Sequence, residues 1–137
     1  MEARSSTPYV IVRCVGPRHE GGETSIQVVD GKTARVIQGS KTVHGNLAAN
    51  NFTFNDVWQS PASDPSDDEQ IMIYQRVGVP AVRTCINGKS SLVLGYGTGQ
   101  EGLLFGTGSL GLVPRVASAI LAGAASDCSV VVSACQL

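Results

Sequence analysis

Four glycines close together form the part of this sequence that could do chemistry. Gly95, Gly97, Gly99 and Gly102 follow a short apolar run, Leu92–Leu94, which we interpret as a buried strand, and a helix-compatible apolar run comes after them. A strand, a Gly-rich turn and a helix in this order can hold phosphate groups on backbone N–H groups. The turn has no lysine and no Ser or Thr at its end, so we expect it to lack the groups that act on a nucleotide.

Length and charge limit the functions that the chain can have. A chain of 137 residues is expected to form a single domain, residues 1–137, with a real core. Its net charge of −1 argues against broad binding to nucleic acid or to anionic membranes. It contains no apolar run of 18 residues and starts without a charged-then-apolar leader, so we expect no membrane span, no secretion and a cytoplasmic location.

The remaining chemistry-bearing side chains are interpreted as structural. Four cysteines show no C-x-x-C pair and are expected to be free thiols in a reducing compartment: Cys14, Cys85, Cys128 and Cys135. His19 and His44 fall in predicted loops and are expected to be solvated surface residues. Four acidic residues, Asp64, Asp67, Asp68 and Glu69, sit where a helix begins, which favours carboxylates without any metal. Arg115 is expected to pair with an acid on a neighbouring element.

The first half of the chain reads as strands. Tyr9–Val15 is almost continuously apolar, and Ser25–Val29 with Thr33–Gln38 flank Asp30-Gly31, a hairpin signal. Phe52–Trp58 alternates and predicts a further strand or the end of one.

The second half reads as helices separated by strands. A helix is predicted over 67–87, capped by Ser66, disturbed by Pro80 and stopped at Asn87-Gly88. After the predicted strand 91–95 and the glycine turn, a helix is predicted over Val113–Ala122 and a last strand over Ser129–Cys135. This order predicts an α/β fold, a mostly parallel sheet with helical layers.

Five motifs in chain order give the sequence a resemblance to the N-terminal third of a kinesin motor domain. They are Cys14-Val15-Gly16-Pro17, Phe52-Thr53-Phe54-Asn55-Asp56-Val57-Trp58, the set Gln70, Tyr74, Pro80 and Gly88, the run Leu92–Gly97, and Gly111-Leu112-Val113-Pro114-Arg115. The resemblance implies a partial kinesin-like mixed sheet of the P-loop NTPase type flanked by helices. It also implies an ATP-binding protein associated with microtubules and the cytoskeleton, with Pro17 on the adenine side.

The phosphate loop departs from the kinesin pattern Tyr-Gly-Gln-Thr-Gly-Ser-Gly-Lys-Thr. The corresponding residues are Tyr96, Gly97, Thr98, Gly99, Gln100, Glu101, Gly102 and Leu103. By this alignment Gly102 stands at the position of the lysine that contacts the terminal phosphates, and Leu103 at that of the magnesium-binding Thr. Glu101 adds a negative charge, so ATP or ADP with Mg²⁺ is expected to bind weakly and not to be hydrolysed. Both switch regions of the family have no counterpart in these residues.

Three interpretations of the loop stay open: a degenerate kinesin phosphate loop, a dinucleotide-binding fingerprint, and a tight connection that binds nothing. Gly97-x-Gly99-x-x-Gly102 fits G-x-G-x-x-G literally, although that fingerprint normally follows the first strand. Accordingly, the chain is expected to be a kinesin-like motor domain fragment unable to hydrolyse ATP. The alternatives are a non-catalytic microtubule or protein interaction module and a dinucleotide-binding enzyme fragment. Because the apolar segment Ser129–Cys135 has no following element to cover it, a protein partner that completes the sheet is also expected.

Overall fold

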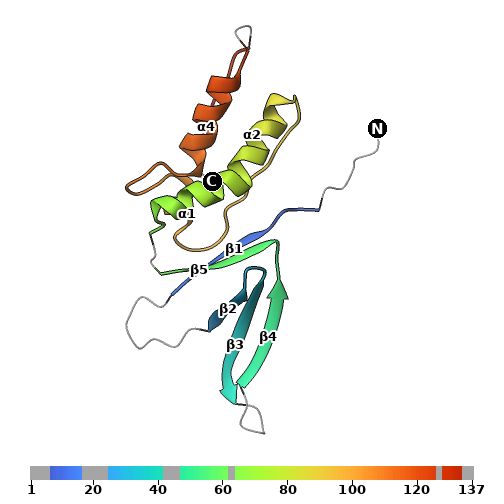
Figure 1. The fold of residues 1–137 in the computed structure, drawn as a ribbon, viewed down its shortest axis with the longest axis vertical. Coiled ribbons are helices and arrows are strands. Elements are labelled where there is room, and N and C mark those ends of the chain that lie inside the picture. The colour runs from blue at the N-terminus through green and yellow to red at the C-terminus, as the bar shows by residue number, and fades with distance from the viewer. Residues whose placement is uncertain (1–6, 17–24, 42–46, 62–63, 126–127, 134–137) are drawn as a thin grey trace. The chain divides into compact units, whose positions relative to one another are not determined.

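The structure is a computed structural model that describes residues 7–16, 25–41, 47–61, 64–125 and 128–133 (Figure 1). The chain divides into two compact units, Met1–Ser63 and Asp64–Leu137. The described strands all lie in the first unit and the described helices all lie in the second. The protein is therefore a mixed α/β protein that contains both parallel and antiparallel strand pairs.

A parallel strand pair begins the first unit. Strand β1 (Ile11–Val15) pairs with β5 (Asp56–Ser60), with Ile11 opposite Asp56 and Val15 opposite Ser60. Side chains tie the two strands together, because Arg13 Nη2 donates to the buried Ser60 Oγ at 2.7 Å and the Tyr9 hydroxyl donates to the Asp56 carboxylate. The predicted strand Tyr9–Val15 is confirmed with a later start.

A three-stranded antiparallel sheet completes the first unit. Strands β2 (Ile26–Asp30) and β3 (Thr33–Lys41) form the predicted hairpin, and β4 (Leu47–Thr53) pairs with the other edge of β3. The turn between β2 and β3 is stabilised by a local hydrogen bond, because the backbone N–H of Lys32 donates to Asp30 Oδ1 at 2.8 Å. A small core of Cys14, Ala34 and Val57 joins this sheet to the parallel pair, with Val12, Val28 and Phe54 packed against it.

Two predictions for the strands are wrong. Phe52–Trp58 is not one strand, since β4 ends at Thr53 and β5 begins at Asp56. Between them the chain changes partners: Phe54 donates its N–H to the Lys32 carbonyl, while Asn55 Oδ1 accepts from the Val10 N–H. The sheet is also not mostly parallel, because the only parallel pair among the described strands is β1 with β5.

One nearly continuous helical run opens the second unit, as predicted for residues 67–87. It consists of α1 (Asp67–Ile73), a π-helical turn η1 (Tyr74–Gly78) and α2 (Val79–Ile86). Ser66 and Glu69 form a reciprocal capping box at its start, with the Glu69 N–H donating to Ser66 Oγ at 3.3 Å. The wide turn η1 lies just before Pro80, whose ring removes one N–H and crowds the carbonyl four residues back.

Helix α4 (Leu112–Gly123) confirms the prediction for Val113–Ala122 and carries Pro114 in its first turn. Figure 1 shows α4 beside α2. Along the chain, the short helix α3 (Gln100–Leu104) comes between α2 and α4 and follows the glycine loop. Leu112 is buried here, as are Ala81 and Val82 of α2.

The two strands predicted for this half are not formed in the described residues. Residues 91–95 and 128–133 have no regular secondary structure and pair with no described strand, and the side chains of Leu94 and Val131 are 81% and 88% exposed. Residues 134 and 135 of the predicted last strand lie outside the described residues. Across the described residues, no helix combines the length and the apolar character needed to cross a bilayer.

Candidate functional site

The backbone of the glycine loop has the turns that its sequence predicts. Gly97 and Gly99 adopt positive φ angles of 117° and 74°, and a β-carbon on either would meet nothing within 4 Å. Gly99 is the N-cap residue of α3, which has no side-chain cap. The loop is therefore open and sharply turned, and it leads into a helix of five residues.

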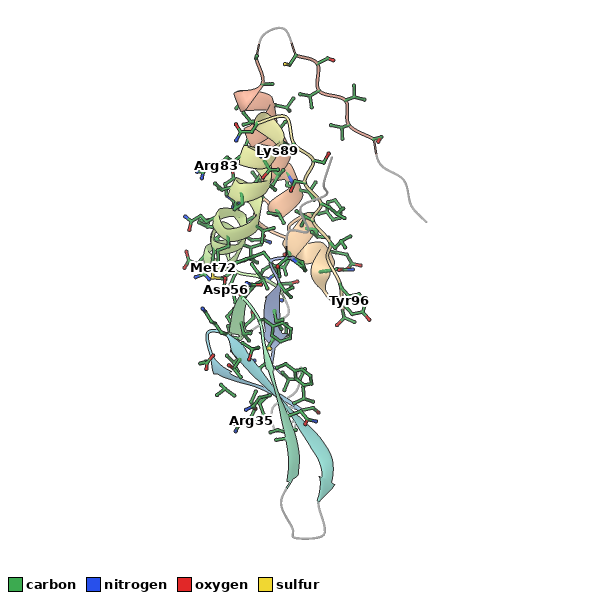
Figure 2. The ribbon with its side chains drawn as sticks, turned by 90° about the vertical axis from the view of Figure 1, so that its right-hand side faces the viewer. Arg35, Asp56, Met72, Arg83, Lys89 and Tyr96 are labelled. Atoms are coloured by element: carbon green, nitrogen blue, oxygen red, sulfur yellow. The ribbon has the colours of Figure 1, made fainter. Side chains whose placement is uncertain are left out.

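The segment in front of the loop does not supply the strand that a phosphate-binding turn needs. The side chains of Leu92 and Tyr96 are 79% and 103% exposed, and Tyr96 is labelled in Figure 2. Because no strand pairing fixes residues 91–95, the strand–turn–helix layout is incomplete in the described part of the chain. The dinucleotide fingerprint lacks its structural context for the same reason.

Charge in the loop is negative. Glu101 is exposed in the first turn of α3, where a carboxylate interacts favourably with the N–H groups of the helix terminus. Residues 95–103 contain no Lys, Arg or His to oppose it. A bound phosphate would thus meet one fixed negative charge and no side-chain cation from the loop itself.

Gly102 is the most informative residue of the loop. It is buried, and a β-carbon added to it would lie 3.1 Å from Pro65 Cδ and 3.5 Å from Thr107 Cγ2. Its carbonyl accepts a hydrogen bond of 2.6 Å from Gln70 Nε2 on α1. The position that the kinesin alignment gives to a phosphate-binding lysine is thus packed inside the second unit.

The other predicted loop residues are distributed around this contact. Leu103, at the magnesium-binding position of the alignment, is half-buried. Thr98 is exposed, and Glu101 is the one carboxylate residue in the sequence of the loop. Gln100 is half-buried, and its Oε1 is shielded from solvent without a hydrogen-bond partner in the described part of the chain. A β-carbon on Gly95 would lie 2.9 Å from that oxygen. The side-chain amide of Gln100 therefore lies close to the backbone of the loop at Gly95.

Several candidates from the sequence lie elsewhere. Pro17, His19 and His44 lie outside the described residues. The acidic residues Asp67, Asp68 and Glu69 form the first turn of α1, as the capping interpretation predicted. Within the described ranges, no group of three or more His, Cys, Asp or Glu side chains is arranged to hold a metal ion.

Arg115 was predicted to pair with an acid, but its Nε atom pairs with a backbone carbonyl instead. Arg115 Nε donates to the Leu110 carbonyl at 2.7 Å, immediately before α4. The side chain therefore closes the turn that leads into its own helix. This bond is local, since only five residues separate the two partners.

Gln70 belongs to one of the family motifs in the sequence, but its contact with Gly102 was not predicted. Gln70 is 1% exposed and is the largest fully buried side chain among the described residues. One signal could have found it, because it lies one turn before Ile73 and Tyr74, on the face of α1 that turns inward. A polar residue at a core position must find a partner inside the protein.

A shallow hollow of about 260 Å³ lies on the second unit away from the loop. It is lined by residues of η1, α2 and the C-cap of α2: the apolar Val79, Val82 and Ile86, and the polar or charged Tyr74, Arg83 and Asn87. It contains no acid or cysteine that could act on a ligand. We therefore assign it no chemistry.

Comparison with known protein families and with characterised proteins finds no match. The resemblance to kinesin motor domains consequently depends on the five sequence motifs alone.

Proposed function

We propose that this chain is a kinesin-like module that associates with microtubules and does not hydrolyse ATP. The observation that carries the second half of the proposal is the burial of Gly102 between Pro65 and Thr107. A site for phosphoryl transfer needs a cation at that position to neutralise the charge that develops on the transferred group. In this protein the position has no side chain and its carbonyl is engaged by Gln70.

Weak binding of nucleotide is compatible with this proposal. The exposed turn at Gly97 and Gly99 leaves backbone open to solvent, and backbone N–H groups can contact an anion. Glu101 opposes that contact, and Leu103 offers no hydroxyl to Mg²⁺. ATP or ADP with Mg²⁺ is therefore expected to bind weakly and to be released unchanged.

Association with microtubules is the part of the proposal that comes from the resemblance. It is supported by the order of the five motifs and by the mixed α/β fold, with its parallel pair β1 and β5. Cytoskeletal localisation in the cytoplasm follows from the same proposal.

A second candidate function is a non-catalytic module that binds another protein. One observation favours it: large apolar side chains are strongly exposed on two segments without regular secondary structure, including Leu92, Leu94, Val131 and Val132. Unpaired extended segments with apolar side chains can add to the edge of another sheet. A partner whose own sheet edge pairs with these segments would cover them.

Co-pelleting of the purified chain with stabilised microtubules tests the proposal. The chain should pellet with microtubules to the same extent with ATP, with ADP and without nucleotide. The absence of pelleting would contradict microtubule association and leave the protein-binding candidate. Release that requires ATP and fails with a non-hydrolysable analogue would contradict the claim that the chain does not hydrolyse ATP.

A further inference from the structure

The contact between Gln70 and Gly102 suggests how the glycine loop is held in place. Gln70 lies on α1 and Gly102 on α3, thirty-two residues later, and the bond between Nε2 and the carbonyl oxygen is 2.6 Å long. Both residues are buried. The bond therefore joins two helices in the interior of the second unit rather than on its surface.

Helix α3 depends on such outside contacts. It has five residues, and helices of this length are not stable on their own in water. Its last carbonyls need partners, and those of Glu101 and Gly102 accept from the N–H groups of Phe105 and Gly106 at 2.8 and 3.0 Å. Gln70 adds a donor to the Gly102 carbonyl from outside this segment.

The oxygen of the Gln70 amide argues against a large contribution of this side chain to the stability of the whole unit. Its Oε1 is shielded from solvent and has no hydrogen-bond partner among the residues that the structure describes. A buried acceptor without a partner is unfavourable, so an apolar side chain of similar length would remove one penalty while losing one hydrogen bond. The amide is thus of little net benefit to folding, but it fixes the position of one carbonyl.

We infer that Gln70 is a positioning residue that holds α3 and the turn after it in place, through the Gly102 carbonyl at the end of the glycine loop. Loss of its donor frees α3 and the turn at Phe105 and Gly106 while the longer helices stay folded. The inference goes beyond the proposed function, because it concerns the order of the loop and is tested without ATP or microtubules.

Hydrogen exchange of the full-length chain, read at individual amides, tests this inference with Gln70→Met. Gln75→Met is the matched control, because Gln75 is exposed on the adjoining turn η1. In Gln70→Met the amides of Phe105 and Gly106 should exchange about tenfold faster, as expected for the loss of one net hydrogen bond. The amides of α4 should keep their rates, and the control should change neither region.

Two results would overturn the inference. One is unchanged exchange at Phe105 and Gly106 in Gln70→Met. The other is an equal acceleration of these amides and of α4, because a residue that only packs the core would act on the whole unit. If Gln70→Met does not fold, the wild-type chain still decides: the Gln70 side-chain amide protons should exchange slowly, and fast exchange contradicts the bond.

Discussion

Pro65 and Gly102 are in such close contact that a β-carbon on Gly102 would lie 3.1 Å from Pro65 Cδ. The two residues are far apart in sequence, yet the proline covers the glycine at the beginning of the helical unit. This contact places packing where the kinesin pattern has a lysine. The inertness that we propose for the loop would therefore be a property of the fold and not only of one missing side chain.

The first prediction compares a lysine at two neighbouring positions. Gly102→Lys should lower the free energy of unfolding by about 1–3 kcal/mol, because its side chain is forced against Pro65 in a packed interior. Glu101→Lys places the same residue at an exposed position and should change stability much less. Urea denaturation measures both, and equal stabilities of the two variants would contradict the packing argument.

The second prediction concerns the left-handed turn at Gly99. Gly99→Ala should cost about 1–2 kcal/mol, because φ is +74° and a β-carbon disfavours this conformation even where space is open. Gly108→Ala is the matched control, since that glycine also has open space but no positive φ. A lower melting temperature for the first variant alone is expected; equal melting temperatures would show that the turn at Gly99 is not held in this conformation.

The third prediction concerns the hairpin turn between β2 and β3. The backbone N–H of Lys32 donates to Asp30 and holds the pKa of its carboxyl below the ordinary value, with smaller contributions from Thr33 and the Lys32 charge. Because the pKa is lowered in the folded state, the ionised group stabilises the protein above the unfolded pKa of about 3.9. That contribution is lost as the pH falls through the folded pKa.

Asp30→Asn removes the charge and tests this sign. The wild type should melt at a higher temperature than the variant near neutral pH, and the difference should shrink on acidification below about pH 3.9. A direct check is the titration of the Asp30 carboxyl carbon by NMR. A midpoint at or above that of an unstructured aspartate would contradict the turn geometry.

The fourth prediction concerns thiol reactivity. Cys14 is 6% exposed, and burial raises the pKa of its thiol, so it holds less thiolate at a given pH. Cys85 and Cys128 are exposed. Iodoacetamide at mildly alkaline pH, followed by peptide mass spectrometry, should label these two first and Cys14 only after denaturant is added. Early labelling of Cys14 in native protein would contradict its place in the core.

Local signals predicted the fold well where neighbouring residues decide the structure. The capping box of Ser66 and Glu69, the hairpin at Asp30-Gly31 and the disturbance before Pro80 all involve residues a few positions apart. Strand pairing did not follow in the same way, because an apolar run such as Leu92–Leu94 becomes a strand only if a distant partner accepts its hydrogen bonds. Phe52–Trp58 is divided for the same reason, since its middle residues form hydrogen bonds with two distant partners, Lys32 and Val10.

In the glycine loop too, local features could be predicted from the sequence, whereas contacts with distant residues could not. Its positive φ angles at Gly97 and Gly99 were implied by residue type, because glycine is the residue that enters this region at low cost. The burial of Gly102 could not be predicted, since it depends on Pro65, Thr107 and Gln70 from three other segments. Residue type alone showed that a lysine was absent but not that the space for it was filled.

Steady-state phosphate release from ATP and Mg²⁺, with and without microtubules, tests whether the chain hydrolyses ATP. We predict no release above the protein-free background under either condition, because the loop supplies no cation and has Leu103 where the kinesin pattern has the magnesium-binding Thr. Gly99→Ala and Gly102→Lys should give the same null result. Release by the wild type that rises with microtubules and disappears in Gly99→Ala would contradict the account and show that the loop acts on ATP.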